Sequence, residues 1–354
     1  MIKKNLWGLH FPMNAHTAFE HPSNILPLVV GIDLGGTQIR VAVLQGSNVR
    51  ARVSTLTGED SAPERVLPRM FQTVEQALHE AGVSLDEIAG IGIGAPGPLN
   101  GRTGVVFSPP NLAWRNVPLR DIFVQHFNKP IFVENDANAA ALGEYMFGAG
   151  RGSKEMAYVT ISTGIGAGVI ADGRILTGIA GTAAELGHMT IDWHGERCNC
   201  GNIGCLESIS SGTAIARSAN KLVAIGKGQA LLDFALAHQD HDRQGVNPVH
   251  ITARTVAHAA EAGITEAQKI IARAAEGLGF GLVNLLHIFN PELVILGGSV
   301  TQIGAPLLEP AMQIVRARAM QVPRDSMRLV IAELGADVGL IGAGALNYYH
   351  LQQA

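Results

Sequence analysis

The sequence predicts an α/β protein of two domains, each built on a mixed sheet flanked by helices, with a deep cleft between the domains. The 354 residues are enough for two domains, since a single domain usually takes about 150. A strand, a glycine-rich turn and a second strand occur near residue 28 and again near residue 156. Apolar residues at helical spacing lie between further buried strands, which is typical of sheets covered by helices.

The composition narrows the class of protein and its partners. Apolar residues make up 47% and charged residues 16% of the chain, which excludes wholesale disorder. The 26 basic and 30 acidic residues give a net charge of −4, so we expect neither a nucleic-acid nor a membrane partner. Polar residues interrupt the apolar stretch 280–296 and the first residues, so we expect no membrane span and no signal peptide. A cytoplasmic location is expected.

The first expected element is a hairpin. Residues 28–32 form a short apolar run, 33–37 (DLGGT) a glycine turn, and 39–44 an alternating second strand. Residues 1–27 contain His and Pro without a sustained period, so we expect them to form a disordered N-terminal extension.

A helix, two strands and another helix are expected next. Apolar positions at helical spacing follow Pro68, and Gly82 ends this helix. Residues 88–94 and 131–134 are short apolar runs typical of buried strands. The alanine-rich segment after the second of them favours a helix from Asp136. We place the domain boundary at this point.

The second half begins with the same strand, turn and strand. Residues 156–161 are expected to form a strand, 162–168 (STGIGAG) a glycine turn, and 169–171 a second strand. Asp172-Gly173 then predicts a hairpin turn.

The remaining elements are a long helix, a buried strand and a final helix. The apolar period predicts a helix over 265–289, whose interior glycines indicate close packing on a neighbour. Residues 293–296 are a buried strand, and the Gly-Gly-Ser turn at 297–299 leads into another helix. The segment 338–349 is expected to be the last helix.

Both glycine turns are candidate phosphate sites. Neither ends in the Gly-Lys-Ser/Thr of a P-loop, and each precedes a strand where a dinucleotide motif needs a helix. Backbone N–H groups in such turns, with the hydroxyls of Thr37 and Thr163, can still bind phosphate oxygens. The alternative for either turn alone is an ordinary tight hairpin. Two such turns and a third glycine pair, Gly297-Gly298, favour the phosphate role.

Two aspartates follow predicted strands. Asp33 is expected to hold Mg²⁺ against a polyphosphate, directly or through water. Its alternative role is to accept hydrogen bonds from the turn amides. Asp136 is expected to be a general base that takes the proton of a sugar hydroxyl as that oxygen attacks a γ-phosphate. Its alternative role is the N-cap of the following helix.

The strongest signal in the chain is a metal site. His188 is followed after nine residues by Cys198, and then by Cys200 and Cys205, the only other cysteines. Three thiolates and one imidazole form a closed tetrahedral zinc site, so the zinc is expected to be structural. The alternatives are buried free cysteines beside a surface histidine, or His194 in place of His188.

Two pairs of residues are candidate sugar contacts. Glu185 and Glu207 flank the metal segment, and carboxylates suit vicinal sugar hydroxyls; otherwise they are solvated loop acids. Asn111 and Trp114 lie on a Pro-rich loop of the first domain, facing the same cleft if the domains close together. Trp114 is otherwise a packing residue.

These motifs together resemble those of the ROK family of sugar kinases, within the actin and hexokinase-like superfamily. The resemblance covers the chain after the N-terminal extension. It rests on DLGGT at 33–37, ENDAN at 134–138, STGIGAG at 162–168, and above all on AELGH at 184–188 with CNCGNIGCLE at 198–207. It implies a two-domain actin-like ATPase fold, related to ribonuclease H, with an interdomain cleft.

The resemblance also implies roles for individual residues. Asp136 is implied as the catalytic base, and the zinc ligands are His188, Cys198, Cys200 and Cys205. The implied hexose contacts are Asn111, Asn135, Asp136, Glu185, His188 and Glu207. The implied nucleotide contacts are Asp33, Gly35, Gly36, Thr37, Thr163, Gly164, Gly297 and Gly298.

We expect the chain to be divided into three parts. We expect the extension to lie outside both domains. A small α/β domain is expected from residues 28–135 with the C-terminal helix 339–354. A large α/β domain with the zinc-binding loop is expected from residues 136–338.

The family includes glucokinases, fructokinases, kinases of N-acetylated hexosamines and repressors. Repressors add an N-terminal helix-turn-helix domain, for which the 27-residue extension is too short, so we expect a kinase. SPPNLAWRNVPL and AELGHMT look most like glucokinases. We therefore expect ATP, Mg²⁺ and structural Zn²⁺, with transfer of the γ-phosphate to the 6-hydroxyl of glucose. The alternatives are N-acetylmannosamine, N-acetylglucosamine, fructose or mannose as substrate, or a non-catalytic sugar sensor. By family analogy we expect a homodimer or higher homo-oligomer.

Overall fold

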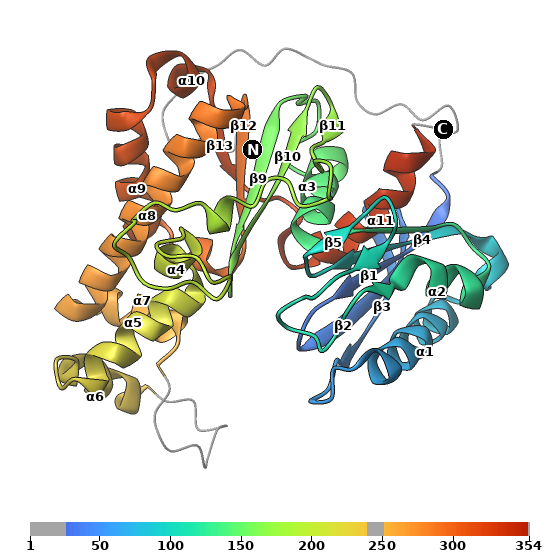
Figure 1. The fold of residues 1–354 in the computed structure, drawn as a ribbon, viewed down its shortest axis with the longest axis horizontal. Coiled ribbons are helices and arrows are strands. Elements are labelled where there is room, and N and C mark those ends of the chain that lie inside the picture. Colours follow the sequence, from blue (N-terminus) through green and yellow to red (C-terminus); the bar gives the residue numbers. More distant parts are fainter. Residues whose placement is uncertain (1–25, 239–250, 353–354) are drawn as a thin grey trace.

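The computed structural model describes residues 26–238 and 251–352. Almost all of the predicted N-terminal extension lies outside the described residues, as do the last two residues of the chain. The described residues form two lobes, each with a five-stranded sheet, and helices α3 and α11 lie between them (Figure 1). Among these residues, no helix is long and apolar enough to cross a membrane.

The two sheets have the same topology. In each, three consecutive antiparallel strands are followed by two strands parallel to the first of them. The order of the first sheet is β3 (Asn48–Leu56), β2 (Gln38–Gln45), β1 (Leu28–Leu34), β4 (Ile88–Ala95) and β8 (Ile131–Asn135). The order of the second is β11 (Arg174–Ile175), β10 (Ile165–Ala171), β9 (Met156–Ile161), β12 (Leu293–Gly297) and β13 (Arg328–Ile331). The strand–turn–strand unit found twice in the sequence therefore begins both sheets.

The outer face of the first sheet is covered by α1 (Pro63–Ala81), and α2 (Leu119–Phe127) packs beside β8. A small sheet of β5 (Leu99–Asn100), β6 (Val105–Val106) and β7 (Val117–Pro118) lies near β8. The prediction that the helix starts after Pro68 was wrong. Pro63 occupies the first turn, where no N–H partner is needed, and Pro68 lies inside the helix. Gly82 ends α1 in the left-handed conformation, as predicted.

The second sheet is covered by a larger helical layer. Its members are α4 (Glu207–Ser210), α5 (Gly212–Ala224), α6 (Gln229–Ala237), α7 (Ala253–Glu261), α8 (Thr265–Phe289), α9 (Ala305–Arg318) and α10 (Gln321–Ser326). The interior glycines of α8 permit close packing, as predicted: a Cβ on Gly279 would lie 2.8 Å from Ile314 Cβ, and one on Gly281 2.5 Å from Leu206 Cδ2.

A separate central core joins the two lobes. Successive strand residues point to opposite faces, so Val159 faces the outer helices while Tyr158 faces the middle of the molecule. There the side chain of Tyr158 packs with α3 (Asp136–Phe147) and α11 (Val338–Leu351). The two helices approach closely, since a Cβ on Gly143 would lie 2.9 Å from Gly342 Cα. The helices at the junction thus carry a core of their own.

Most predicted elements are confirmed, and the differences concern their ends. The glycine turn predicted over 162–168 is shorter, because β10 already begins at Ile165 and pairs with β9. The hairpin turn Asp172-Gly173 is confirmed, with positive φ at both residues. Strand β3 was not predicted, because only alternate residues along it are partly buried and it carries Arg50 and Arg52.

Candidate functional site

The first glycine turn joins β1 to β2. Gly35 N donates to Gln38 O at 2.9 Å, and the buried Thr57 hydroxyl donates to Gly35 O at 2.7 Å. A Cβ on Gly36 would lie 2.7 Å from Asn111 Cβ, so the loop that carries Asn111 lies against this turn. Thr37 is exposed. The turn therefore presents backbone and hydroxyl groups to solvent beside a polar side chain.

Asp33 lies at the end of β1 and pairs with Arg40. Arg40 Nε donates to Asp33 Oδ2 at 3.0 Å, and its Nη2 contacts the same oxygen. Arg40 Nη1 also donates to Ala336 O at 2.9 Å. The alternative that Asp33 accepts turn amides is wrong; an ion pair holds it instead. Its other carboxylate oxygen has no hydrogen-bond partner among the described residues and suits a cation.

Asp136 is the first residue of α3. The N-cap of α3 is Asn135, whose Oδ1 accepts from Ala137 N at 2.9 Å. The alternative role of Asp136 as N-cap is therefore wrong, although its Oδ1 also accepts from Ala137 N at 2.8 Å. Although solvent reaches the Asp136 side chain, the surrounding protein desolvates it. This desolvation, with the carboxylates of Asp33 and Glu185, raises the pKa of Asp136 to about 6. A carboxylate with such a pKa is suited to accept a proton near neutral pH.

The second glycine turn joins β9 to β10 and lies beside the turn that follows β12. Thr213 Oγ1 donates to Thr163 O at 2.6 Å, and Ser162 Oγ is 3.4 Å from Ser299 Oγ. Gly298 has a φ of +88°, and a Cβ there would clash with Ile161 O. The structure thus brings two predicted nucleotide-binding segments, 162–164 and 297–298, together.

The predicted metal ligands form one cluster. The ligand atoms of His188, Cys198, Cys200 and Cys205 all lie within 4.8 Å of one another. Cys198 Sγ is 3.7 Å from His188 Nδ1, and Cys200 Sγ is 3.7 Å from Cys205 Sγ. Ligands around tetrahedral zinc, with bonds near 2.3 Å, are separated by about 3.8 Å. The donor set and its spacing therefore fit Zn²⁺, and His194, the alternative ligand, is outside the cluster.

The thiols of this cluster favour a cation. Burial and the neighbouring sulfur atoms raise the pKa of Cys205 to about 12, so this thiol is neutral when no cation is nearby. A divalent cation would reverse that balance and bind the thiolate.

Glu207 links the metal cluster to the second glycine turn. Its Oε2 accepts from Ile165 N at 2.9 Å, and Cys198 Sγ lies 3.8 Å from its Oε1. A Cβ on Gly164 would clash with Glu207 Oε2. Burial, with the nearby Glu207 carboxylate, raises the pKa of Glu185, while His188 lowers it. Glu185, His188 and Glu207 therefore lie near one another, and their role as hexose contacts stays a prediction.

Trp114 does not join this site. Its side chain is 2% exposed and packs in the core of the first sheet with Phe123, so the expectation that it faces the cleft was wrong. The apolar indole is better stabilised inside the core than in a polar crevice.

Several contributing residues were missed at the sequence level. Arg40 is directly opposite Asp33 in the β1–β2 register, so the hairpin alone could have identified the pair. Thr57, Thr213 and Ser299 come from segments distant in sequence. No local pattern marks them, because their roles depend on how β3, α5 and the turn after β12 pack.

The two sheets have the same topology, and a glycine turn joins the first two strands of each. With an acidic residue between them, they define a two-domain actin-like ATPase fold. Within this class the chain belongs to the ROK family, whose family model matches residues 29–349.

Individual relatives include both enzymes and regulators. The chain is 38% identical to a glucokinase of Halalkalibacterium halodurans, over 90% of this chain and 94% of the relative. It is 34% identical to a xylose repressor of Caldicellulosiruptor bescii, over 90% of this chain and 77% of the repressor. A ROK family glucokinase from Streptomyces griseus, solved in complex with glucose and AMPPNP, superposes with a TM-score of 0.75 at 31% identity, covering 90% of this chain and 98% of that one.

Proposed function

We propose that the protein is an ATP-dependent sugar kinase that transfers the γ-phosphate of ATP to the 6-hydroxyl of glucose. The observation that carries the proposal is the position of Asp136 at the start of α3, where the charges of Asp33 and Glu185 help to raise its pKa. Asp33 lies at the end of β1, next to the first glycine turn, and Glu185 precedes the predicted metal ligands. A proton acceptor between a phosphate-binding turn and a sugar-binding segment is what phosphoryl transfer to a hydroxyl needs.

Different residues of the chain would have different roles in this reaction. Glu185, Glu207, His188, Asn111 and Asn135 would hold the sugar hydroxyls. Asp136 would accept the proton of the 6-hydroxyl as that oxygen attacks the γ-phosphorus and the bond to the β-phosphate oxygen breaks. Positioning supplies most of the rate in such a transfer.

The nucleotide would lie along the glycine turns. The backbone N–H groups around Gly35, Gly36 and Gly164, with Thr37 and Thr163, would contact the phosphates, and Gly297-Gly298 would border the nucleoside. Asp33 would hold Mg²⁺, which neutralises phosphate charge when bound.

Zinc would act on the sugar side only. Bound to His188 and the three cysteines, it would keep the segment from Glu185 to Glu207 folded. All four protein ligands are supplied by this segment, so no coordination position is left for a reacting water.

A coupled ATP assay over glucose, mannose, fructose, N-acetylglucosamine and N-acetylmannosamine tests the proposal. Glucose is expected to give the highest kcat/KM. Asp136→Asn is expected to lower kcat by about 10²–10⁴-fold with a small change in the KM for sugar. Asp172→Asn, the same exchange at the exposed hairpin turn, is the matched control and should retain full activity.

The second candidate is a sugar sensor without turnover, which the 34% identity to a xylose repressor favours. Sugar binding without phosphorylation of any hexose would select this candidate. Full activity of Asp136→Asn would instead reject the assignment of the base.

A further inference from the structure

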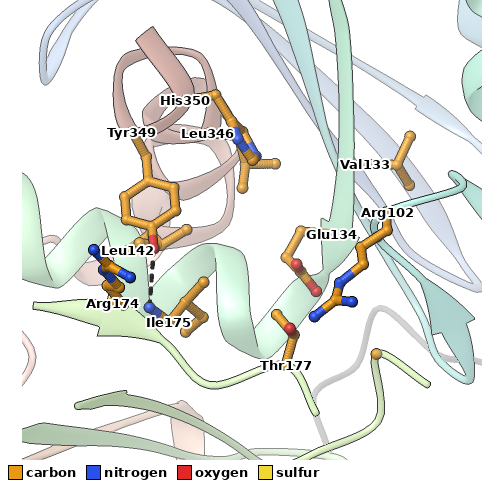
Figure 2. A pocket seen from close by; sticks show the side chains of 12 residues that line it. Arg102, Val133, Glu134, Leu142, Arg174, Ile175, Thr177, Leu346, Tyr349 and His350 are labelled. Carbon is orange, nitrogen blue, oxygen red and sulfur yellow. Dashed lines mark hydrogen bonds between the residues drawn. The ribbon is translucent and has the colours of Figure 1, made fainter. Parts of the chain in front are cut away.

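A cavity of about 260 Å³ lies at the junction of the two lobes (Figure 2). One wall is formed by Arg102 and Glu134 from the first lobe, and another by Arg174 and Thr177 from the second. A third part of the lining is formed by Leu346, Tyr349 and His350 of α11. The volume is somewhat below the roughly 300–1,000 Å³ of drug-sized sites, which suits a ligand of monosaccharide size.

This cavity is distinct from the candidate catalytic site. None of the predicted sugar, nucleotide or metal residues lines it. Successive residues of a strand point to opposite faces, so Glu134 and Asn135, both on β8, face different sides of the sheet. Asn135 caps α3 beside Asp136, whereas Glu134 lines the cavity.

Glu134 brings a buried carboxylate to the cavity. The residue is 7% exposed, and its Oε1 accepts from Asn135 N at 2.9 Å and from Asn138 Nδ2 at 3.1 Å. Its Oε2 has no hydrogen-bond partner among the described residues. A Cβ on Gly101 would lie 2.8 Å from this oxygen, so the glycine leaves room beside it. The two hydrogen bonds to Oε1 hold the carboxylate in place, so Oε2 is a fixed acceptor for a ligand in the cavity that supplies a donor.

Two guanidinium groups face the same space. Figure 2 shows the Arg102 side chain extending toward Glu134 and Thr177, with Arg174 beside Tyr349 at the other end. Within the described part of the chain, neither guanidinium has a hydrogen-bond or ion-pair partner. Guanidinium groups bind phosphate oxygens well. Arg174 is the better phosphate ligand of the two, because Arg102 lies nearer the Glu134 carboxylate.

The remaining wall suits the carbon face of a sugar ring. The Tyr349 ring, Leu346 and Ile175 are apolar, and the Tyr349 hydroxyl is held by Ile175 N at 3.0 Å. Sites for small molecules combine such apolar walls with a few fixed polar groups.

We propose that this cavity is a second binding site, specific for a phosphorylated monosaccharide. Arg174 binds the phosphate, a sugar hydroxyl donates to Glu134 Oε2, and Arg102 donates to hydroxyl oxygens of the sugar. A ligand held by both lobes stabilises one arrangement of the lobes over others, and Glu134 lies two residues before Asp136. Binding of a sugar phosphate in this cavity would therefore affect the arrangement of the lobes at the candidate catalytic site. The proposal goes beyond the proposed function, because it does not require that this chain produce the sugar phosphate.

Calorimetric titration with glucose 6-phosphate, with and without excess glucose, tests the site. Binding is expected to persist in excess glucose. Arg174→Ala and Arg102→Ala are each expected to weaken it by about tenfold or more. Arg254→Ala removes an exposed arginine on α7 that does not line the cavity, and this variant should bind as the wild type does. Inorganic phosphate and glucose, titrated separately as probes, should each bind more weakly to the cavity than glucose 6-phosphate.

Three results would overturn the site. They are no binding of glucose 6-phosphate at millimolar concentration, complete displacement by glucose, or equal affinity in the wild type and both arginine variants. The titration requires no turnover, so its outcome is independent of the hexose assay. The cavity can fail to bind glucose 6-phosphate in an active kinase, and it can bind this ligand in a protein without kinase activity. The Asp136→Asn variant should retain cavity binding even where its turnover is lost.

Discussion

The two glycine turns share one backbone device and differ in what surrounds them. Each joins the first two strands of a five-stranded sheet, and each lies against one candidate sugar contact: Gly36 against Asn111, and Gly164 against Glu207. The first turn is held by Thr57, which directly follows β3. The second is held by Thr213 and by the metal-cluster segment, which packs against it through Glu207.

The difference lies in the charged groups beside each turn. Beside the first turn, Arg40 holds the Asp33 carboxylate in an ion pair. Beside the second, Glu207 connects the turn to the segment that carries the metal cluster. Under the proposed function, the first turn would hold charge near the nucleotide, while the second would connect the nucleotide to sugar recognition.

Loss of the metal should give the largest difference between the effects at the two turns. Cys205→Ser or chelation is expected to remove one zinc per chain and to weaken sugar binding by about 100-fold or more, because the segment carrying Glu185 and Glu207 loses its fixed geometry. Nucleotide binding should change much less, since the first turn has no contact with the cluster. Metal analysis with titrations of sugar and nucleotide measures both effects. Restored sugar affinity on adding zinc back to chelated protein is the control, and unchanged sugar affinity in metal-free protein would contradict the expectation.

A pair of matched glycine substitutions sharpens the difference. In Gly164→Ala, the new methyl group displaces the end of the Glu207 side chain and breaks its hydrogen bond from Ile165 N. The KM for sugar is expected to rise by about tenfold, with little change in stability. In Gly36→Ala, the methyl group meets Asn111 Cβ at 2.7 Å and Asn111 O at 3.2 Å. The whole loop must then move, which costs about 1–3 kcal/mol of stability.

Steady-state kinetics and thermal unfolding of both variants check this pair. Equal effects of the two substitutions on stability and on KM would show that the two turns have equivalent surroundings.

The smallest expected effect is that of the Asp136 charge on the stability of the protein. The Asp136 pKa is raised to about 6 from about 3.9 in the unfolded chain. Its contribution to stability is therefore fully present below pH 4 and is lost as the pH rises through 6. Asp136→Asn should be more stable than the wild type at pH 8. Because solvent reaches and screens the side chain, the gain should be on the order of 1 kcal/mol.

Thermal unfolding between pH 4 and 8 measures this gain, which should disappear near pH 4. Glu309→Gln, at an exposed carboxylate on α9, is the control for the exchange of a carboxylate for an amide. A variant less stable than the wild type at pH 8 would contradict the raised pKa.

Local patterns predicted those parts of the fold that local interactions specify. Asp172-Gly173 takes the positive φ values that a tight hairpin needs, and the apolar period over Thr265–Phe289 matches α8 from end to end. The metal cluster was predictable because its four ligands lie within 18 residues of chain and require a single cation. Glu207 was predictable as a neighbour of that cluster.

Predictions were weaker where a residue's role depends on distant partners. Trp114 has a polar N–H and lies on a Pro-rich loop, so its sequence context suited a cleft, but packing against Phe123 buried it. Asn135 occupies the N-cap position of α3, and Asp136, the first helical residue, also accepts from Ala137 N. The end of β8 decides which residue takes the N-cap position, and the local sequence does not show where that end lies.

The sequence by itself determined the two hairpin turns, the end of α1 at Gly82 and the cysteine–histidine cluster, since each depends on residues close together in the chain. Only the tertiary structure decided that Arg40 also donates to Ala336, that Glu207 reaches the second turn, and that Glu134, Arg102 and Arg174 share one cavity. The physical reason is that these contacts form only when two sheets and the helices α3 and α11 pack together. The free energy of that packing comes from buried surface spread over the whole molecule, which no single motif records.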